Sequence, residues 1–591
     1  MGRPGAEPVP ASNEVAPFDV NALAALANQF FSALPGETPS PSLGGVPAPT
    51  NPLPGGAPTV PLSPPSPDAA RHASSLPGAA LPGANIAPAQ PQSVLNLGAS
   101  SPSLLPHAAA PNGLPDHAAI VPPAIDGRFG GVTLGVPEAY AASLPLGFVE
   151  RNPSSASPYY FLDPPSSQDQ GGGRYYFSEQ RSAGPAGFDV HAIRRDFPIL
   201  QERVNGKPLV WFDNAATTQK PKVVIDRVSY FYEHENSNIH RAAHELAARA
   251  TDAYENARNI VTRFIGAGSP DEIIFVRGTT EAINLIAKTW GAANVGRGDE
   301  IIVSNLEHHA NIVPWQQLCE ANGAKLRVIP VDDTGQVRLD EYAKLLNERT
   351  RLVSVTQVSN ALGTVVPVQQ IVAMAHAAGA KALVDGAQSV SHLKVDVRAL
   401  DADFFVFSGH KIFGPTGIGV VYGKRALLEQ MPPWQGGGNM IADVTFERTV
   451  FQPPPNKFEA GTGNIADAVG LGAALEYVER LGLPAIAAYE HDLLVYATHG
   501  LQTVPGIRLV GTAAEKASVL SFVLPGWQTE EIGRALNEEG IAVRSGHHCA
   551  QPILRRFGLE ATVRPSLAFY NTCEEVDLLV RVVDRLARSR R

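Results

Sequence analysis

The chain has 591 residues but only three cysteines, no long apolar run and no block of Lys or Arg. Three cysteines are too few for a disulfide framework and fit a reducing cytoplasm. The apolar runs are shorter than a membrane span, and the N-terminus lacks a basic segment followed by an apolar core, so we expect neither a membrane partner nor export. The formal net charge of −10 also argues against nucleic acid as a partner.

Residues 1–187 lack lysine and hold 33 of the 51 prolines of the chain. Most of the other residues there are Ala, Gly, Ser and Leu, and such a segment buries too little apolar surface to offset the entropy of ordering it. We therefore predict a long disordered N-terminal extension, the leader, over residues 1–187 and assign no fold to it.

Three apolar islands interrupt the leader. Residues 18–36 have a short amphipathic helical pattern that places Leu26 and Phe30 on one face, and residues 159–163 and 174–178 repeat a Tyr-Tyr-Phe motif. An apolar helical face, or a few aromatic anchors without a core of their own, is typical of docking peptides. The alternative is that all three islands fold back onto the surface of the same chain.

From residue 188 onward, helical patterns alternate with short apolar strands, which predicts an α/β fold with a mainly parallel sheet and ligands at the carboxyl ends of its strands. We expect an N-terminal segment and a large domain over 188–465, with 209–212 as the strand that enters it. A smaller α+β domain should follow over 466–591. The strands expected in the sheet are 272–276, 300–303, 325–329, 352–355, 382–384, 404–407 and 419–422.

A lysine follows the most apolar of these strands. Residues 404–407 end in a Ser-Gly-His-Lys turn, and a buried Lys411 without a partner would lose its charge, which suits an amine that forms a Schiff base with an aldehyde cofactor. A lone lysine there would more often extend to solvent, but strand 382–384 ends in Asp385. That carboxylate is the partner that the pyridinium nitrogen of pyridoxal phosphate (PLP) needs; taken alone, it could also cap a following helix.

These two segments, Val-Asp-Gly-Ala-Gln at 384–388 and Ser-Gly-His-Lys at 408–411, resemble the class V (fold type I) family of PLP enzymes, which includes aminotransferases and cysteine desulfurases. The Arg-Ser-Gly-His-His-Cys-Ala-Gln-Pro segment at 544–552 resembles the C-terminal domain of SUF-type (group II) cysteine desulfurases. The resemblance implies the fold type I architecture, with a large PLP-binding domain and a small C-terminal domain. Further motifs that carry it lie at 212–218, 277–284, 307–315 and 563–572.

The resemblance implies a role for each matching residue in converting L-cysteine to L-alanine. Lys411 holds PLP and removes the Cα proton of the substrate, and Cys549 is the nucleophile that receives the sulfur as a persulfide. His308 stacks on the pyridine ring, while Arg564 and Arg544 bind the substrate carboxylate. The other ligands of substrate or cofactor that it implies are Thr279, Thr280, Asn360, Asp385, Gln388, Ser408, His410 and, from a neighbouring subunit of a homodimer, Thr462; no metal ligand is assigned.

Two of these roles also have a physical argument from the sequence. The Gly-Thr-Thr segment at 278–280 precedes a helix expected over 281–289, so its N–H groups and hydroxyls should bind the PLP phosphate at a helix N-terminus. Positive charge from Arg544 and from the two histidines at 547–548 should favour the thiolate form of Cys549.

The leader together with its islands resembles that of the cargo enzymes of family 2 encapsulin shells. This resemblance implies that residues 1–187 bind a shell protein and that the enzyme works inside a nanocompartment in the cytoplasm. Other functions stay open: a selenocysteine lyase, or a SUF-system sulfur donor for iron–sulfur clusters whose leader acts as an adaptor. The sulfur could pass to an acceptor protein or be stored as the element.

Overall fold

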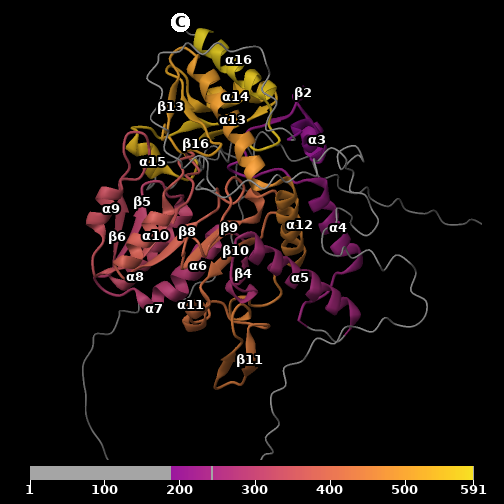
Figure 1. Ribbon diagram of the computed structural model, residues 1–591, viewed down its shortest axis with the longest axis vertical. Helices are drawn as coiled ribbons and strands as arrows, with labels where there is room; N and C mark the ends of the chain where they lie inside the picture. The colour runs from indigo at the N-terminus through magenta and orange to yellow at the C-terminus, as the bar shows by residue number, and fades with distance from the viewer. Residues whose placement is uncertain (1–187, 241–243, 590–591) are drawn as a thin grey trace, which may run out of the picture. The chain divides into compact units, whose positions relative to one another are not determined.

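The computed structural model describes residues 188–240 and 244–589 (Figure 1). The disordered leader and its three islands, expected within residues 1–187, lie outside the described residues. Within the described ranges, every helix is too short or too polar to cross a membrane.

A seven-stranded sheet forms the centre of the described part, with the strand order β4-β10-β9-β8-β7-β5-β6. Neighbouring strands from β9 to β6 run parallel, and β10 alone is antiparallel to both of its neighbours, β9 and β4. The mainly parallel sheet and its seven strands are therefore confirmed. The strands are β4 (Ile273–Val276), β5 (Glu300–Ser304), β6 (Lys325–Ile329), β7 (Thr350–Thr356), β8 (Lys381–Asp385), β9 (Phe404–Ser408) and β10 (Gly419–Gly423).

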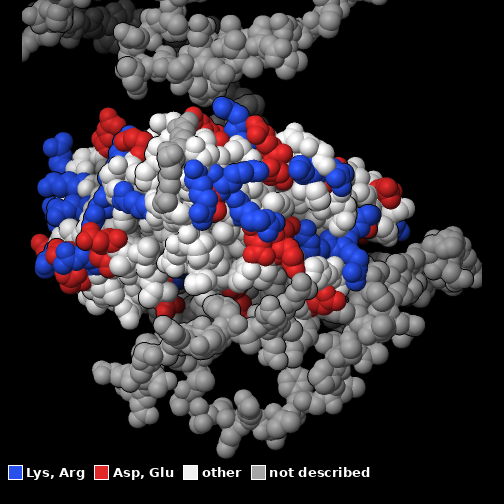
Figure 2. Space-filling view, turned by 90° about the horizontal axis from the view of Figure 1, so that it is seen from above, with Lys and Arg blue, Asp and Glu red and all other residues white. Residues whose placement is uncertain are grey.

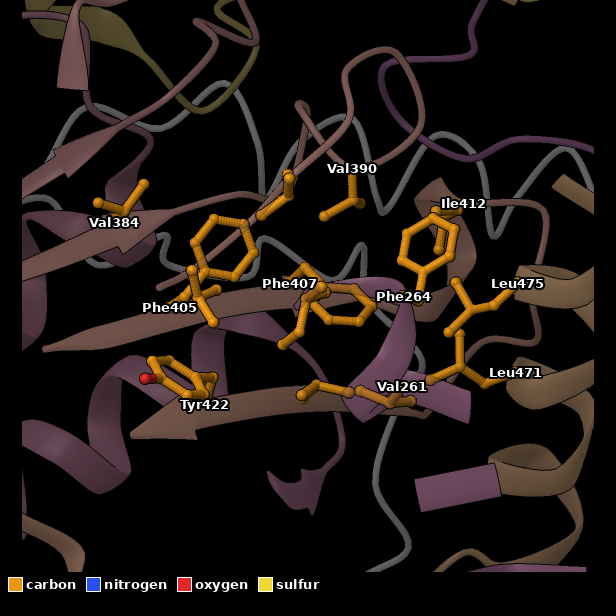
Figure 3. Close-up of a cluster of buried hydrophobic side chains, with 14 of the residues drawn as sticks. Val261, Phe264, Val384, Val390, Phe405, Phe407, Ile412, Tyr422, Leu471 and Leu475 are labelled. Carbon is orange, nitrogen blue, oxygen red and sulfur yellow. The ribbon is translucent and has the colours of Figure 1, made fainter. Parts of the chain in front are cut away.

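Helices cover both faces of this sheet, because the central strands are apolar on both sides. Every residue of β9 is buried. On one face, Phe405 and Phe407 pack in a cluster with residues of α5 (Glu245–Phe264) and α12 (Ile465–Leu481), among them Leu471 (Figure 3). Helix α12 also packs on α4 (Lys222–His234).

The alternate residues of β9 face the opposite side of the sheet, as the period of a strand requires. Phe404 and Val406 pack there with α6 (Thr279–Ile286), the π-helical turn Ala287–Gly291 and α8 (Val313–Asn322). A strand that is buried on both faces reads as a continuous apolar run, which is why it was recognisable in the sequence. The remaining helices around the sheet are α7 (Ala292–Asn294), α9 (Leu339–Leu345), α10 (Val368–Ala377) and α11 (Arg425–Gln430).

A second, antiparallel sheet with the order β13-β14-β17-β16 lies near the C-terminus and has its own apolar core. Its strands are β13 (Arg508–Val510), β14 (Ser521–Val523), β16 (Arg544–Gly546) and β17 (Thr562–Arg564), and its helices are α13 (Leu483–Gln502), α14 (Thr529–Glu538) and α16 (Cys573–Ser589). Basic and acidic side chains are interspersed on the face that Figure 2 shows. On α16, Arg588 pairs with Asp584 at 2.7 Å.

The strand at the start of the described part differs from the expectation for residues 209–212. Strand β3 (Val210–Trp211) does not join the large sheet but pairs in parallel with β15 (Ile541–Ala542). The reason is apolar packing, because Val210 and Phe212 are buried in the core of the C-terminal sheet. The segment after β3 therefore starts next to the C-terminal sheet.

A hairpin that the sequence analysis did not predict consists of β11 (Ile441–Val444) and β12 (Thr449–Phe451). It extends away from the large sheet in Figure 1. Several of its apolar side chains are exposed to solvent, and the side chain of Phe446 at its tip is fully exposed.

Strand β10 approaches the start of α6 at two glycines. A Cβ atom added at Gly419 would lie 2.5 Å from the Cα atom of Gly278 and 2.7 Å from the carbonyl oxygen of Phe407. Both neighbours are backbone atoms, so neither can move aside cheaply. Gly419 thus sets how closely β10 packs on the end of α6 that the candidate site uses.

We expect Gly419→Ala to lower the free energy of unfolding by about 1–3 kcal/mol, because the new methyl group has no space between two backbone segments. Thermal unfolding of the purified protein measures this. Gly436→Ala is the matched control, since no atom lies within 4 Å of a Cβ there. Equal melting temperatures for the two variants would contradict the close packing at Gly419.

Candidate active site

A cavity of about 180 Å³ lies where β5, β7, β8 and β9 end. These four strands are neighbours in the sheet, in the order β9-β8-β7-β5, and run parallel, so the residues that follow them meet at one edge. All site residues assigned from the sequence line this cavity except Thr462, which is exposed and lies outside it. Those in its wall are Thr279, Thr280, His308, Asn360, Asp385, Gln388, Ser408, His410, Lys411, Arg544, Cys549 and Arg564.

Lys411 lies in the short helical turn Gly409–Lys411 that directly follows β9. Removal of its amine from water lowers the pKa of Lys411 to about 8, and the nearby Asp385 partly opposes this shift. An amine with this pKa is neutral far more often at neutral pH than an exposed lysine, which is what reaction with an aldehyde requires.

Asp385 ends strand β8, and only 4% of its surface is exposed. Its Oδ1 atom accepts a hydrogen bond of 2.9 Å from the N–H of Ala387. Burial raises the pKa of this carboxyl, and Lys411 acts in the opposite direction. The residues that follow are turns and not a helix, so Asp385 is not a helix cap. A buried carboxylate with one backbone donor suits a cationic ring nitrogen in the cavity.

Hydroxyl groups that line the cavity gather at the start of α6. Helix α6 begins at Thr279, two residues earlier than expected, so Thr279 and Thr280 form its first turn. The backbone N–H of Thr279 donates to Ser408 Oγ at 2.8 Å, and the two hydroxyl oxygens are also 2.8 Å apart. A helix N-terminus with three hydroxyls is a suitable site for a phosphate. Burial lowers the pKa of the adjacent His410 to about 4, so its ring is neutral at pH 7.

His308 follows β5 and caps a short helical turn, with its Nδ1 atom accepting the N–H of Ala310 at 3.1 Å. Burial, and secondarily the charge of Lys411, lowers the pKa of His308 to about 3, so the ring is neutral. The preceding Glu307 was not assigned a role from the sequence. Its buried carboxyl group, whose pKa is raised to about 8 by burial, accepts hydrogen bonds from Asn311 Nδ2 at 2.7 Å and the N–H of Thr356 at 2.9 Å, which fix the turn that carries His308.

Cys549 lies in a loop with an unusual backbone: His548 and Cys549 have φ angles of 54° and 53°, in the left-handed region. The loop is held on both sides of Cys549. The N–H of His309 donates to the carbonyl oxygen of Cys549 at 2.8 Å, and the N–H of Cys549 donates to Nδ1 of His547 at 3.0 Å.

These contacts correct the expected source of positive charge near Cys549. Burial lowers the pKa of His548 to about 2, so this ring is neutral at pH 7 and does not supply the expected charge. The cations that line the cavity with Cys549 are Lys411, Arg544 and Arg564.

Asp213 holds the two arginines, a role that the sequence analysis missed although the residue lies in one of its motifs. Its carboxylate accepts Nη2 of Arg564 at 3.0 Å and pairs with Nε of Arg544 at 3.3 Å. Arg564 also donates from Nη1 to the carbonyl oxygen of Asn360 at 2.9 Å, while Asn360 Nδ2 donates to the carbonyl oxygen of His548 at 2.7 Å. Two atoms of this network, Arg564 Nε and Asn360 Oδ1, are buried without a hydrogen-bond partner.

The residues present fit PLP. The hydroxyls at the start of α6 suit the phosphate, Lys411 the aldehyde and Asp385 the ring nitrogen, while the neutral His308 is available for the ring face. Gln388 lines the cavity and also donates from Nε2 to the carbonyl oxygen of Ala215 at 2.6 Å. The unpartnered atoms of Arg564 and Asn360 show that the cavity retains polar groups for a further ligand.

Known proteins resemble this chain over about two thirds of its length. The chain is 72% identical over 405 residues to a cysteine desulfurase of Synechococcus elongatus, covering 68% of this chain but only 65% of that relative. A cysteine desulfurase of Salmonella gallinarum is 53% identical over 402 residues, with 68% of this chain and 99% of the relative covered. A solved cysteine desulfurase of Thermococcus onnurineus matches with a TM-score of 0.65 at 39% identity, covering 68% of this chain and 98% of that one.

The first of these relatives is thus matched over slightly less than two thirds of its own length. The family model described as aminotransferase class V matches residues 210–579, which is more than half of the chain. The two-sheet arrangement agrees with the fold type I architecture of its solved neighbours. By sequence and by fold, this chain belongs to the class V aminotransferase family of PLP-dependent enzymes.

Proposed function

We propose that the chain is a PLP-dependent cysteine desulfurase of the SUF type (group II), which converts L-cysteine to L-alanine and leaves the sulfur as a persulfide on Cys549. One observation carries the proposal: Cys549 lines the same cavity as Lys411 and Asp385. The lysine and the carboxylate would serve many PLP enzymes, whereas a cysteine in this position adds a sulfur acceptor. The relatives named as cysteine desulfurases support the same activity.

In this proposal Arg564 binds the substrate carboxylate. Its guanidinium is planar and has more N–H donors than the bonds to Asp213 and Asn360 use. Arg544 shares the Asp213 carboxylate and adds a second positive charge. Binding of the carboxylate in this way would direct the side chain of the substrate within the cavity, so that its sulfur can meet Cys549.

When bound, PLP supplies an electron sink for the negative charge that develops at the substrate Cα. Lys411 removes the Cα proton, because an amine with a pKa of about 8 is available as a base near neutral pH. Cys549, as the thiolate, then attacks the substrate sulfur. An S–S bond forms on Cys549 while the Cβ–S bond of the substrate breaks. The three-carbon product leaves as alanine after Cβ takes up a proton and Lys411 returns a proton to Cα.

We further propose a homodimer in which Thr462 completes the phosphate site of the partner. The segment that carries Thr462 is joined to the base of the β11–β12 hairpin, since the N–H of Gly461 donates to the carbonyl oxygen of Gly438 at 2.9 Å. The hairpin exposes Val444 and Phe446 among other apolar side chains, and such patches are typical of protein contacts. The exposed position of Thr462, outside its own cavity, supports the proposal.

Residues 1–187 are proposed to direct the enzyme into an encapsulin shell. The support is the proline-rich, lysine-free composition of the leader, its three apolar islands, and the start of the family match only at residue 210. In this proposal residues 188–465 bind PLP and residues 466–591 carry Cys549. The enzyme would then work inside a cytoplasmic nanocompartment, where the sulfur is stored or passed to an acceptor protein.

The pKa of Lys411 makes the loading of the apoenzyme with PLP dependent on pH. Only the neutral amine attacks the aldehyde, so the loading rate should rise with pH and level off above about pH 8, the pKa of Lys411. Stopped-flow detection of the yellow absorbance of lysine-bound PLP measures the rate. Lys411→Ala is the control and should not develop this absorbance. A midpoint near pH 10, as for an exposed lysine, would contradict the assignment.

Replacement of the nucleophile should separate cofactor binding from sulfur transfer. We expect Cys549→Ser to bind PLP normally but to form alanine from L-cysteine about 10³-fold more slowly or worse, because a hydroxyl cannot accept the sulfur. Cys573→Ser is the matched control, since Cys573 is exposed and lies outside the cavity. Alanine formation from L-cysteine by Cys549→Ser at the wild-type rate would show that Cys549 is not the nucleophile. Residual activity of this variant on selenocysteine, without activity on L-cysteine, would be compatible with the proposed role.

Deletion of residues 1–187 should leave a folded and active dimer, because the residues that line the cavity all lie beyond the leader. The same deletion should abolish co-purification with a co-expressed shell protein. Activity assays and size-exclusion chromatography of the truncated protein test the first part. For the second, the leader is fused to an unrelated soluble protein, and failure of the shell to enclose this fusion would refute the targeting role.

A further inference from the structure

Lys220 is a half-buried lysine that the mechanism does not use. Partial burial lowers the pKa of Lys220 to about 8. Its amine donates hydrogen bonds to Thr217 Oγ1 at 3.2 Å and to the carbonyl oxygens of Thr218 and His410, the latter at 3.5 Å. These partners are neutral, and among the residues that the structure describes none forms an ion pair with Lys220. A cation removed from water without a counter-ion is costly unless an anion compensates it.

The carbonyl oxygen of His410 receives an unusual number of donors. Besides Lys220, it accepts the N–H of Thr218 at 2.9 Å and the hydroxyls of Thr217 and Thr218 at 3.0 and 3.2 Å. This carbonyl belongs to the peptide bond that joins His410 to Lys411. In a planar trans peptide the C=O and N–H groups point in opposite directions. A cation beside the oxygen therefore polarises the peptide and strengthens the N–H of Lys411 as a donor on the other side.

The candidate phosphate site lacks a positive charge among its expected ligands. The candidate phosphate ligands Thr279, Thr280 and Ser408 are uncharged, and His410 is neutral because burial lowers its pKa to about 4. The phosphate of PLP carries roughly two negative charges at pH 7. The nearest arginine along the chain, Arg277, is no counter-ion, because its side chain is 82% exposed and pairs with Glu281.

We propose that Lys220 is a positioning residue that supplies the counter-charge for the phosphate of PLP, acting across the His410–Lys411 peptide. This inference rests on the proposed PLP-dependent function. Lys220 lacks an anionic partner, and the expected phosphate ligands lack a cation. His410 lies next to both: its carbonyl oxygen accepts a hydrogen bond from the amine of Lys220, and the ring of His410 lines the cavity. The Thr217–Thr218 contacts then hold the peptide in place, while the charge of Lys220 makes the site selective for a phosphorylated cofactor.

The test compares the affinity of the full-length apoenzyme for PLP with its affinity for pyridoxal, which lacks the phosphate. We expect Lys220→Met to weaken PLP binding by about tenfold, the effect of one partly screened charge, and to leave pyridoxal binding unchanged. Lys220→Arg should restore most of the PLP affinity. Lys222→Met is the matched control, since its amine is exposed and pairs with Asp226 on the surface of α4.

The readout separates a charge effect from a merely structural one. Equal weakening of PLP and pyridoxal binding, or no change in either, would overturn the inference, because Lys220 would then only support the turn of Lys411 or do nothing. A wild-type apoenzyme that binds neither compound would overturn the proposed function itself.

Should Lys220→Met not fold, Lys220→Gln is used together with inorganic phosphate as the probe. Phosphate should raise the melting temperature of the wild-type apoenzyme more than that of Lys220→Gln. An equal rise in the two proteins would again overturn the inference.

Discussion

The amine of Lys411 is kept out of water at the end of a strand that is buried on both faces, and the arrangement of the site depends on this. Strand β9 supplies no polar side chain before Ser408, so the turn that carries Lys411 is the first place where the chain meets a polar environment. Burial brings the pKa of the amine down to about 8, and Asp385 on the next strand keeps it from falling further. The same apolar core thus determines where the lysine lies and how basic it is.

The site also depends on contacts between segments that are far apart in the sequence. Asp213 follows the strand β3, which pairs with β15 near the C-terminus. The carboxylate of Asp213 forms ion pairs with Arg564 and Arg544. A few residues further on, Thr217 and Thr218 bond to the peptide that precedes Lys411. One short segment therefore connects the residues proposed to bind the substrate with the lysine proposed to bind the cofactor.

Charge in the cavity is concentrated on few groups. The histidines that line it are neutral at pH 7, because burial lowers the pKa values of His308, His410 and His548 well below their usual range. Positive charge comes from arginines and from Lys411, and negative charge from Asp385, while Asp213 pairs with the arginines without lining the cavity itself. Neutral imidazoles can stack and accept hydrogen bonds without competing with the arginines for an anionic substrate.

The sequence by itself determined the fold class and most of the candidate site. Six of the seven strands of the large sheet are almost entirely buried and read as apolar runs, which made them predictable, whereas the edge strand β6 is partly exposed; the motif residues lie at the ends of strands. Some contacts are local, and a sequence pattern can reveal them: Asp189 caps the helix α3 (Val190–Arg195) by accepting the N–H of Ala192 at 3.0 Å.

Only the tertiary structure decided the partners and protonation states. The pairing of β3 with β15 joins segments more than 300 residues apart, and its two-residue strands carry no periodicity that could reveal it. The roles of Asp213 and Lys220 depend on which distant groups surround them, as does the neutrality of His548. A sequence names the ionisable groups, but their pKa values depend on burial and neighbouring charges, which exist only once the chain has folded.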